Sequence, residues 1–374
     1  MSGGASVEET LELWASSLRG IKERIRPLFT QERVAASAAR FLDVLLGNEP
    51  RKTGWMRAEA AGDPGPWRQQ ALLGRGTWDA DALRDVVREY AVEQLCDDKA
   101  VLVIDETGFL KQGKASCGVA RQYTGSAGKI TNCQIGVFAA YVSDKGHAFI
   151  DRALYLPKAW TSDSARMRAA RVPETVGFAT KPALAVEMIE RALAAHVPFA
   201  WVAADSVYGV GDIEAVLRLS AGQGTKGERL YDWAYSELAD LDASEYDEHR
   251  TGLWTRGLLI RRNPTDSDMA YFATCCPKDT SIETLVRVEG TRWRIEEGFE
   301  TAKNELGLDH NETRSWHGWH RHISLVMLAY AMMAAVQHQA NSTPKKTKSR
   351  IPKNSSVGRS RKFGALPSNS PSAR

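Results

Sequence analysis

The charged side chains between Arg292 and Lys303 are of the types that hold a divalent metal ion beside a phosphate. In a helix, at about 100° per residue, Arg292, Glu296 and Lys303 cluster at the edge of an apolar stripe, while Glu297 points to the far side. A carboxylate flanked by two cations suits an acid that binds a metal ion while the cations bind phosphate oxygens. One helix cannot complete such a site, so the chain must supply further acids.

Two such acids follow short apolar runs that have the composition of buried strands. Asp105 ends the run Lys99–Asp105, and Asp205 ends the run Phe199–Asp205. Open α/β sheets bind ligands at the carboxyl ends of their strands, so both aspartates stand at ligand-binding positions. Each aspartate alone could also be a turn former or a helix N-cap. Two strand-end aspartates followed by a flanked helical glutamate favour the catalytic interpretation.

In this order the residues resemble the DDE transposases of bacterial insertion sequences, a branch of the RNase H-like superfamily. The spacing Arg292-(3)-Glu296-(6)-Lys303 matches part of the Y-R-E-K signature of that branch, with Glu289 at the tyrosine position. Shorter strings similar to the same branch begin at Asp105, Arg121, Asn132, Asp205 and Trp316. The resemblance extends from about Ala35 to Ala340.

The resemblance implies an α/β fold with an RNase H-like mixed sheet and flanking helices, an inserted β subdomain and an N-terminal all-α DNA-binding domain. It also implies that Asp105, Asp205 and Glu296 are the catalytic residues and the ligands of two Mg²⁺ ions, for which Mn²⁺ can substitute. Three converging carboxylates need such cations, and a site with oxygen ligands alone argues against zinc. The expected reaction is phosphodiester hydrolysis at the ends of the element, followed by strand transfer.

The expected DNA contacts fall into two groups. Near the acids, Arg292 and Lys303 would hold phosphates, Lys111 and Lys114 would follow the backbone, and Tyr208 would position a strand or simply pack. The N-terminal group lies on predicted helices and the turns between them: Arg51, Lys52, Arg57, Arg68 and Arg75. These residues are compatible with a helix-turn-helix module, and the alternative is a plain helical bundle with solvated basic side chains.

The pattern changes from helical to strand-like near residue 96. We therefore predict a helical, helix-turn-helix-like DNA-binding domain over 1–95, an RNase H-like catalytic domain over 96–340 with a β insert at about 219–285, and a basic disordered tail over 341–374. Predicted helices are Val7–Leu28, Glu32–Leu46, Thr53–Ala61, Trp67–Leu73, Asp79–Leu95, Lys181–His196 and His322–Gln339. Predicted strands beyond the two acidic runs are Ala115–Thr124, Ile130–Ser143, His147–Pro157, Tyr231–Asp240, Gly252–Arg262 and Met269–Cys276.

Composition limits the function classes. The net charge of the 374 residues is +3, but the tail from residue 341 carries nine basic side chains and no acid, so the rest of the chain is net negative. DNA binding must therefore depend on local patches of positive charge.

Five cysteines without CxxC spacing indicate reduced thiols. No apolar run reaches the ~18 residues of a membrane span, so we expect a cytoplasmic protein, nucleoid-associated when bound to DNA.

The expected partners are double-stranded DNA, both terminal inverted repeats and target, and further copies of the chain in a homo-oligomer.

Between Ala215–Arg218 and the Gly-rich segment Leu219–Gly227, which we expect to be flexible, the chain leaves no room for the fifth strand of an RNase H-like sheet. This favours an alternative function: a catalytically dead or internally deleted remnant that only binds the terminal repeats. A general nuclease of RNase H type is a third possibility.

Other motifs are weaker. Gly125–Lys129 lacks the spacing of a phosphate-binding loop and predicts a hairpin turn. Four histidines, His310, His317, His320 and His322, have no zinc-ligand spacing and are expected to face DNA or to pack. Ser206 has no identifiable His and Asp partners, so a serine recombinase is not expected.

Overall fold

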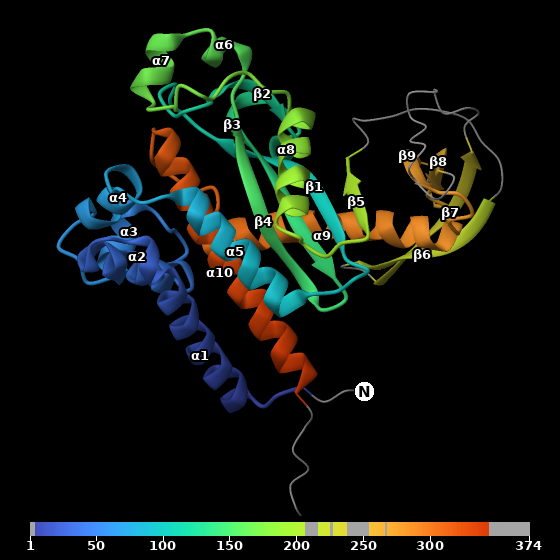
Figure 1. Cartoon of the computed structure of the whole chain (residues 1–374), viewed down its shortest axis with the longest axis horizontal. Coiled ribbons are helices and arrows are strands. Elements are labelled where there is room, and N and C mark those ends of the chain that lie inside the picture. The colour runs from blue at the N-terminus through green and yellow to red at the C-terminus, as the bar shows by residue number, and fades with distance from the viewer. Residues whose placement is uncertain (1–3, 206–215, 225–226, 238–253, 266–267, 344–374) are drawn as a thin grey trace, which may run out of the picture.

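Two β-sheets and the helices around them form the described part of the chain. The computed structural model describes residues 4–205, 216–224, 227–237, 254–265 and 268–343. A five-stranded sheet lies at the centre, and a four-stranded sheet lies to one side of it (Figure 1). The fold is thus mixed α/β, as the sequence predicts.

The central sheet is mixed in strand direction. Its strands are β1 (Val101–Leu110), β2 (Ala120–Thr124), β3 (Lys129–Ser143), β4 (Gly146–Tyr155) and β5 (Trp201–Ala204). One edge of β3 pairs antiparallel with β1, and its other edge pairs with β2 and then β4. β5 pairs parallel with β1. Successive residues from Cys133 to Val142 are buried, which requires cover on both faces of the sheet and explains the unbroken apolar sequence of β3.

The N-terminal quarter of the chain is helical and packs on the core of the central sheet. Its elements are α1 (Val7–Ile25), a 3₁₀ turn (Arg26–Leu28), α2 (Glu32–Leu45), α3 (Gly54–Ala60), α4 (Trp67–Gly74) and α5 (Ala80–Leu95). A capping box between Ser6 and Glu9 begins α1, and the Asp79 carboxylate begins α5 by accepting from the Asp81 amide. The buried residues of α1, α2, α4 and α5 belong to one hydrophobic core with those of the sheet.

Helix α10 (Trp316–Ser342) is largely buried and lies in the middle of that core. Figure 1 shows it running beside α1 and α5. Among the described residues it is the one helix long and apolar enough to cross a membrane, but 67% of its apolar window is buried inside the protein. A core helix has the same composition, and the packing of α10 on α5 and β4 accounts for its apolar surface.

Three helices separate the central sheet's β4 and β5. They are α6 (Lys158–Thr161), α7 (Ser164–Ala169) and α8 (Lys181–Ala194). The sequence predicts α8 but neither of the two short helices. Thr180 caps α8 by accepting from the Ala183 amide, and the buried face of the helix packs on β3 and β4. The chain leaves the end of α8 close to the start of β5.

Helix α9 (Ile282–Leu306) contributes to two hydrophobic cores. Near its start, Leu285 and Val286 share a small core with Trp233 and Leu259 of the second sheet. Further on, Ile295, Phe299, Ala302 and Leu306 enter the main core. The second sheet has the order β6 (Val216–Gly224), β7 (Gly227–Glu237), β8 (Trp254–Arg262) and β9 (Met269–Pro277), all antiparallel. In Figure 1, α9 extends from behind the central sheet to this second sheet.

The structure differs from the sequence prediction in three places. The Gly-rich segment predicted as a flexible connection pairs with β7 up to Gly224 and forms β6, because antiparallel pairing satisfies its backbone. β1 continues past Asp105 to Leu110, because β3 is long enough to pair with all of it. Residues 115–119 are not a strand, since Gly118 has φ +76° and turns the chain before β2. The predicted tail lies outside the described residues from residue 344 onward.

Candidate active site

Strand register brings the two aspartates together. β1 and β5 pair in parallel up to Ile104 and Ala204, so Asp105 and Asp205 follow immediately on adjacent strands. The side chain of Asp105 is 14% exposed, and its Oδ1 accepts a hydrogen bond from the Glu106 amide. The Asp205 side chain is 48% exposed. Both acids therefore lie at the same edge of the sheet, as the sequence predicts, although β1 continues past Asp105 to Leu110.

Helix α9 brings the third acid to the same point, and Arg292 lies between all three. The Nη1 atom of Arg292 is 4.0 Å from Asp105 Oδ2, 3.9 Å from Asp205 Oδ1 and 3.9 Å from Glu296 Oε1. The guanidinium side chain is 11% exposed. Residues four apart share a helix face, so the Arg292–Glu296 spacing places both on the side of α9 that faces the strands. The structure thus places the three predicted acids around Arg292, the residue predicted to contact a DNA phosphate.

A fourth carboxylate, Glu289, belongs to the same cluster. Its Oε1 lies 3.6 Å from Arg292 Nε, and both atoms are buried without a hydrogen-bond partner. The sequence prediction noted Glu289 only as a departure from a tyrosine. The signal that could have identified it is its spacing, three residues before Arg292 on the same helix face.

Burial makes the acid cluster electrostatically unfavourable. It raises the pKa of Asp105 to about 7, although Arg292 and the Glu106 amide act in the opposite direction. Burial also raises the pKa of Glu289 to about 7, and it raises the pKa of Glu296 above its ordinary value. One guanidinium is therefore too little positive charge for the carboxylates around it.

The donor set fits a hard divalent cation. Asp105, Asp205 and Glu296 offer oxygen atoms alone, as Mg²⁺ and Mn²⁺ prefer, and the surplus of negative charge favours a dication. Among the described residues, no three acidic, histidine or cysteine side chains already lie in a metal-coordinating arrangement. The three acids surround the guanidinium at 3.9–4.0 Å, so Arg292 lies between the groups that would hold the ion.

Lys303 lies further along α9 and ties this helix to the β2–β3 hairpin. Its Nζ donates to Thr107 Oγ1 at 2.7 Å and to Ser126 Oγ at 2.9 Å. Ser126 lies in a short 3₁₀ turn over Gly125–Ala127, so this segment is the hairpin connection that the sequence predicts. Burial lowers the pKa of Lys303. The ammonium lies beside two hydroxyl groups that can also bind phosphate oxygens.

Several other basic residues have structural partners. Lys52 and Arg57 are both 2% exposed; Arg57 donates to the Lys52 carbonyl, and its guanidinium lies over the Phe41 ring. Buried cations of this kind cannot reach DNA, so neither is retained as a contact. The Lys111 ammonium donates to the Asn311 carbonyl, and burial lowers its pKa. Arg51 and Lys114 are exposed, and Tyr208 lies outside the described residues.

Arg68 and Arg75 are exposed and line a groove between α2 and α4, which we call the arginine groove. Its volume is about 680 Å³. Arg33 and Arg40, which the sequence prediction did not include, complete its set of four exposed arginines. Of the described residues that line it, none is acidic, although Asp63, which is not part of the lining, pairs with Arg68 at 2.8 Å and with Arg40 at 3.7 Å. The groove is therefore a local positive patch.

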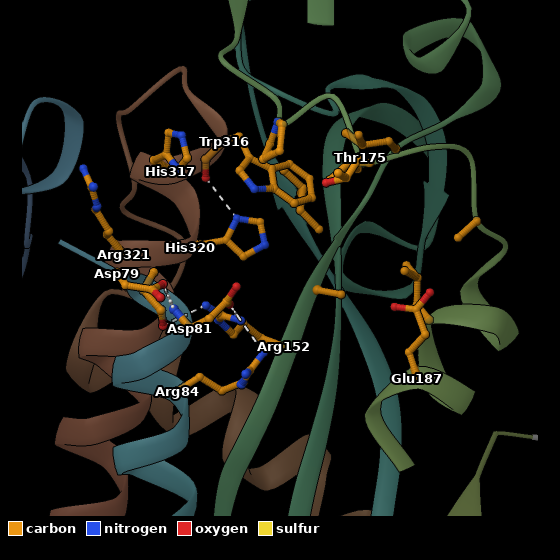
Figure 2. A pocket seen from close by; sticks show the side chains of 18 of the residues that line it. Asp79, Asp81, Arg84, Arg152, Thr175, Glu187, Trp316, His317, His320 and Arg321 are labelled. Carbon is orange, nitrogen blue, oxygen red and sulfur yellow. Dashed lines mark hydrogen bonds and ion pairs between the residues drawn. The ribbon is translucent and has the colours of Figure 1, made fainter. Parts of the chain in front are cut away.

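A separate cavity of about 710 Å³ lies between the starts of α5 and α10, and β4, α8 and the segment 173–179 before α8 form the rest of its wall (Figure 2). Its charges compensate one another: Arg152 pairs with Asp81 at 2.8 Å and donates to the Ser324 hydroxyl. The ring of His320 is bonded to the Trp316 carbonyl, and burial lowers its pKa to about 3. His322 is also buried, so both histidines pack as the sequence allows.

The free cysteines agree with reduced thiols, as predicted: Cys117, Cys133 and Cys276 are buried, and Cys96 and Cys275 are exposed.

Comparisons with known proteins identify the family of the chain. Residues 25–266, which include Asp105 and Asp205, match the family model described as DDE superfamily endonuclease. The chain is also 32% identical over 145 residues to the probable transposase for insertion sequence element IS701 from Microchaete diplosiphon, a match that covers 38% of this chain and 35% of that protein. The chain thus spans about a third of the length of this relative. Because the family model covers more than half of the sequence, the chain belongs to the DDE superfamily endonuclease family.

Proposed function

We propose that the protein is a DDE transposase that hydrolyses phosphodiester bonds at the ends of its insertion sequence and transfers the freed strands to target DNA. One observation carries the proposal: three carboxylates from two adjacent strands and one helix lie within 4.0 Å of a single guanidinium nitrogen. Membership of an endonuclease family and the similarity to a probable transposase support it.

Asp105, Asp205 and Glu296 would hold the divalent metal. Two Mg²⁺ or Mn²⁺ ions, when bound, would supply activation of the attacking hydroxyl or water and stabilisation of the leaving oxygen. The chain itself contributes orientation, because β1, β5 and α9 are fixed in the hydrophobic core on which the acids rest. Lys303, Ser126 and Thr107 would hold the phosphate next to the scissile bond.

The N-terminal helices would bind the terminal inverted repeats as the DNA-binding domain. The arginine groove supports this role, since four exposed guanidinium groups without an acidic neighbour in the lining match a phosphate backbone. Arg51 and Lys114, both exposed, are retained as further contacts. We place the protein in the bacterial cytoplasm, associated with the nucleoid when bound and acting as a homo-oligomer on the two ends of the element.

A second candidate function has one observation in its favour. Among the described residues β5 is an outer strand of the central sheet, at the edge where the resemblance implies one further strand. A remnant that binds the terminal repeats without cleaving them would be compatible with this shortened edge.

Cleavage of a labelled duplex that carries the element's own end separates the two functions. We expect Mg²⁺-dependent nicking at the element boundary, and we expect Glu296→Gln to lower its rate by at least about 100-fold, because a metal ligand is lost. Glu297→Gln is the matched control, since Glu297 lies on the same helix and pairs with Arg294 on another face. Specific binding without nicking by the wild-type protein would support the remnant instead.

A further inference from the structure

Arg292 occupies the position in which a divalent ion would join the three acids. Its Nη1 atom lies within 4.0 Å of all three carboxylates, while Glu289 lies 3.6 Å from its Nε atom. The motif spacing by itself assigns Arg292 to DNA phosphate. The geometry shows that, without DNA, the same side chain is turned toward the acids.

We propose that Arg292 is an internal stand-in for the metal: it neutralises and assembles Asp105, Asp205 and Glu296 in the metal-free protein and leaves them when the ions enter. This inference rests on the proposed function, because it concerns the metal site of that reaction. It adds a competition within the protein between a side chain and a metal for the same three carboxylates.

The character of the contacts makes Arg292 displaceable. All four separations, 3.6–4.0 Å, are within ion-pair distance but longer than a hydrogen bond. A guanidinium that formed bidentate bonds to one carboxylate would be fixed at 2.7–2.9 Å, in the ordinary range for such pairs. Here the cation is shared among four acids, and its buried Nε atom has no hydrogen-bond partner. The guanidinium of Arg292 is held by its charge and by its burial. A dication can supply the same positive charge to the acids and so replace it.

Glu289 supplies a partner that Arg292 can keep after displacement. It lies three residues before Arg292 on α9, is 7% exposed, and contacts Nε, the atom farther from the three metal-binding acids. A dication repels the guanidinium from Asp105, but Glu289 continues to attract it. The guanidinium of Arg292 then has two different partners. Its Nε atom remains near Glu289, and its terminal nitrogens are released toward a DNA phosphate. Entry of metal and capture of DNA by Arg292 are thereby linked.

Metal affinity tests this competition without any catalytic readout. Mn²⁺ binding to the DNA-free protein can be measured from the electron paramagnetic resonance signal of the free ion. We expect Arg292→Gln to bind Mn²⁺ at least about tenfold more tightly than the wild-type protein, since no internal cation has to be displaced. Arg294→Gln is the matched control because Arg294 is on the same helix but pairs with Glu297; its Mn²⁺ affinity should equal that of the wild type.

A second measurement follows the response to metal in the wild-type protein itself, and a variant serves only to assign the signal. In ¹⁵N-arginine spectra, the Nε–H signal of Arg292 is identified as the one missing from Arg292→Lys. We expect Mg²⁺ to shift this signal, whereas the signal of Arg294 should not move.

The outcomes distinguish this inference from the proposed function. Mn²⁺ binding that Asp105→Asn abolishes and Arg292→Gln leaves unchanged would overturn the stand-in role while the metal site remains. An Arg292 signal that Mg²⁺ does not shift would overturn it too. If neither the wild type nor Arg292→Gln binds Mn²⁺, the proposed metal site and the inference both fail. Tighter binding by Arg292→Gln, lost again in the Asp105→Asn, Arg292→Gln double variant, would support both.

Discussion

Replacing Asp105 with Asn should stabilise the metal-free protein at high pH, because the native fold buries a carboxylate that it only partly compensates. Burial raises the pKa of Asp105 from 3.8 to about 7. Between these values the native state binds more protons than the unfolded state. The free energy of unfolding therefore falls as the pH rises from about 4 to about 7, and it remains lowered above pH 7. Asn has the shape of the neutral acid and does not ionise.

The expected magnitude follows from the size of the shift. Each pKa unit corresponds to about 1.4 kcal/mol, and the change from 3.8 to about 7 corresponds to about 4 kcal/mol. The side chain is only 14% exposed, so solvent screens little of this energy. We expect Asp105→Asn to raise the free energy of unfolding by about 2–4 kcal/mol at pH 8 in EDTA, and by only about 1 kcal/mol at pH 4.5, which lies just above the unfolded-state pKa of 3.8.

Urea unfolding followed by tryptophan fluorescence measures both values. Glu297→Gln, an exposed change on α9, is the control and should alter stability little at either pH. Added Mg²⁺ should reverse the order at pH 8, since the wild type binds the ion and the variant does not. The electrostatic reasoning would be refuted by an Asp105→Asn protein that is no more stable than the wild type at pH 8, or by a stabilisation that is as large at pH 4.5 as at pH 8.

Three other predictions concern separate parts of the molecule. Burial lowers the pKa of His147 to about 4, so wild-type stability should fall as the pH drops from 6.5 toward 4, and urea titrations should show a smaller fall in His147→Gln. Arg75→Gln should weaken DNA binding and reduce the slope of log affinity against log salt by about one, whereas Arg19→Gln, outside the arginine groove, should leave the slope unchanged in anisotropy titrations. Lys303→Met should lower the single-turnover cleavage rate at least about tenfold with unaltered Mn²⁺ affinity, and an equal rate would exclude its phosphate contact.

The positions of the acids could be predicted because they follow from local patterns. Strand composition identifies β1 and β5, and helical spacing places Arg292 and Glu296 on one face of α9. The direction in which Arg292 points could not be predicted, since it depends on the β1–β5 register and on the way α9 crosses both strands. Lys52 illustrates the same limit: its burial depends on partners far along the chain, such as His310, which accepts from its amide.

The strand β6 shows why glycine-rich sequence is a weak indicator of a loop. Its composition has little preference for a strand, but β7 offers an antiparallel partner from Ala234 back to Gly227, interrupted by one irregularity between Ser220 and Gln223. Tertiary pairing outweighs the local preference. The four basic residues of the arginine groove are another example, because Arg33 and Arg40 come from α2 and meet Arg68 and Arg75 only when α2 packs on α4.

Helix α9 acts as a lever between the second sheet and the acids. Leu285 and Val286 fix its first turns in the small core, and Glu296 lies about 15 Å further along, at about 1.5 Å per residue. A rigid helix converts a small tilt of the second sheet into a displacement of Glu296 and Arg292. A misplacement of about 1 Å can change a reaction rate by about 100-fold. A tilt of the four-stranded sheet would therefore change the geometry of the acid cluster, although the acids themselves lie on other elements.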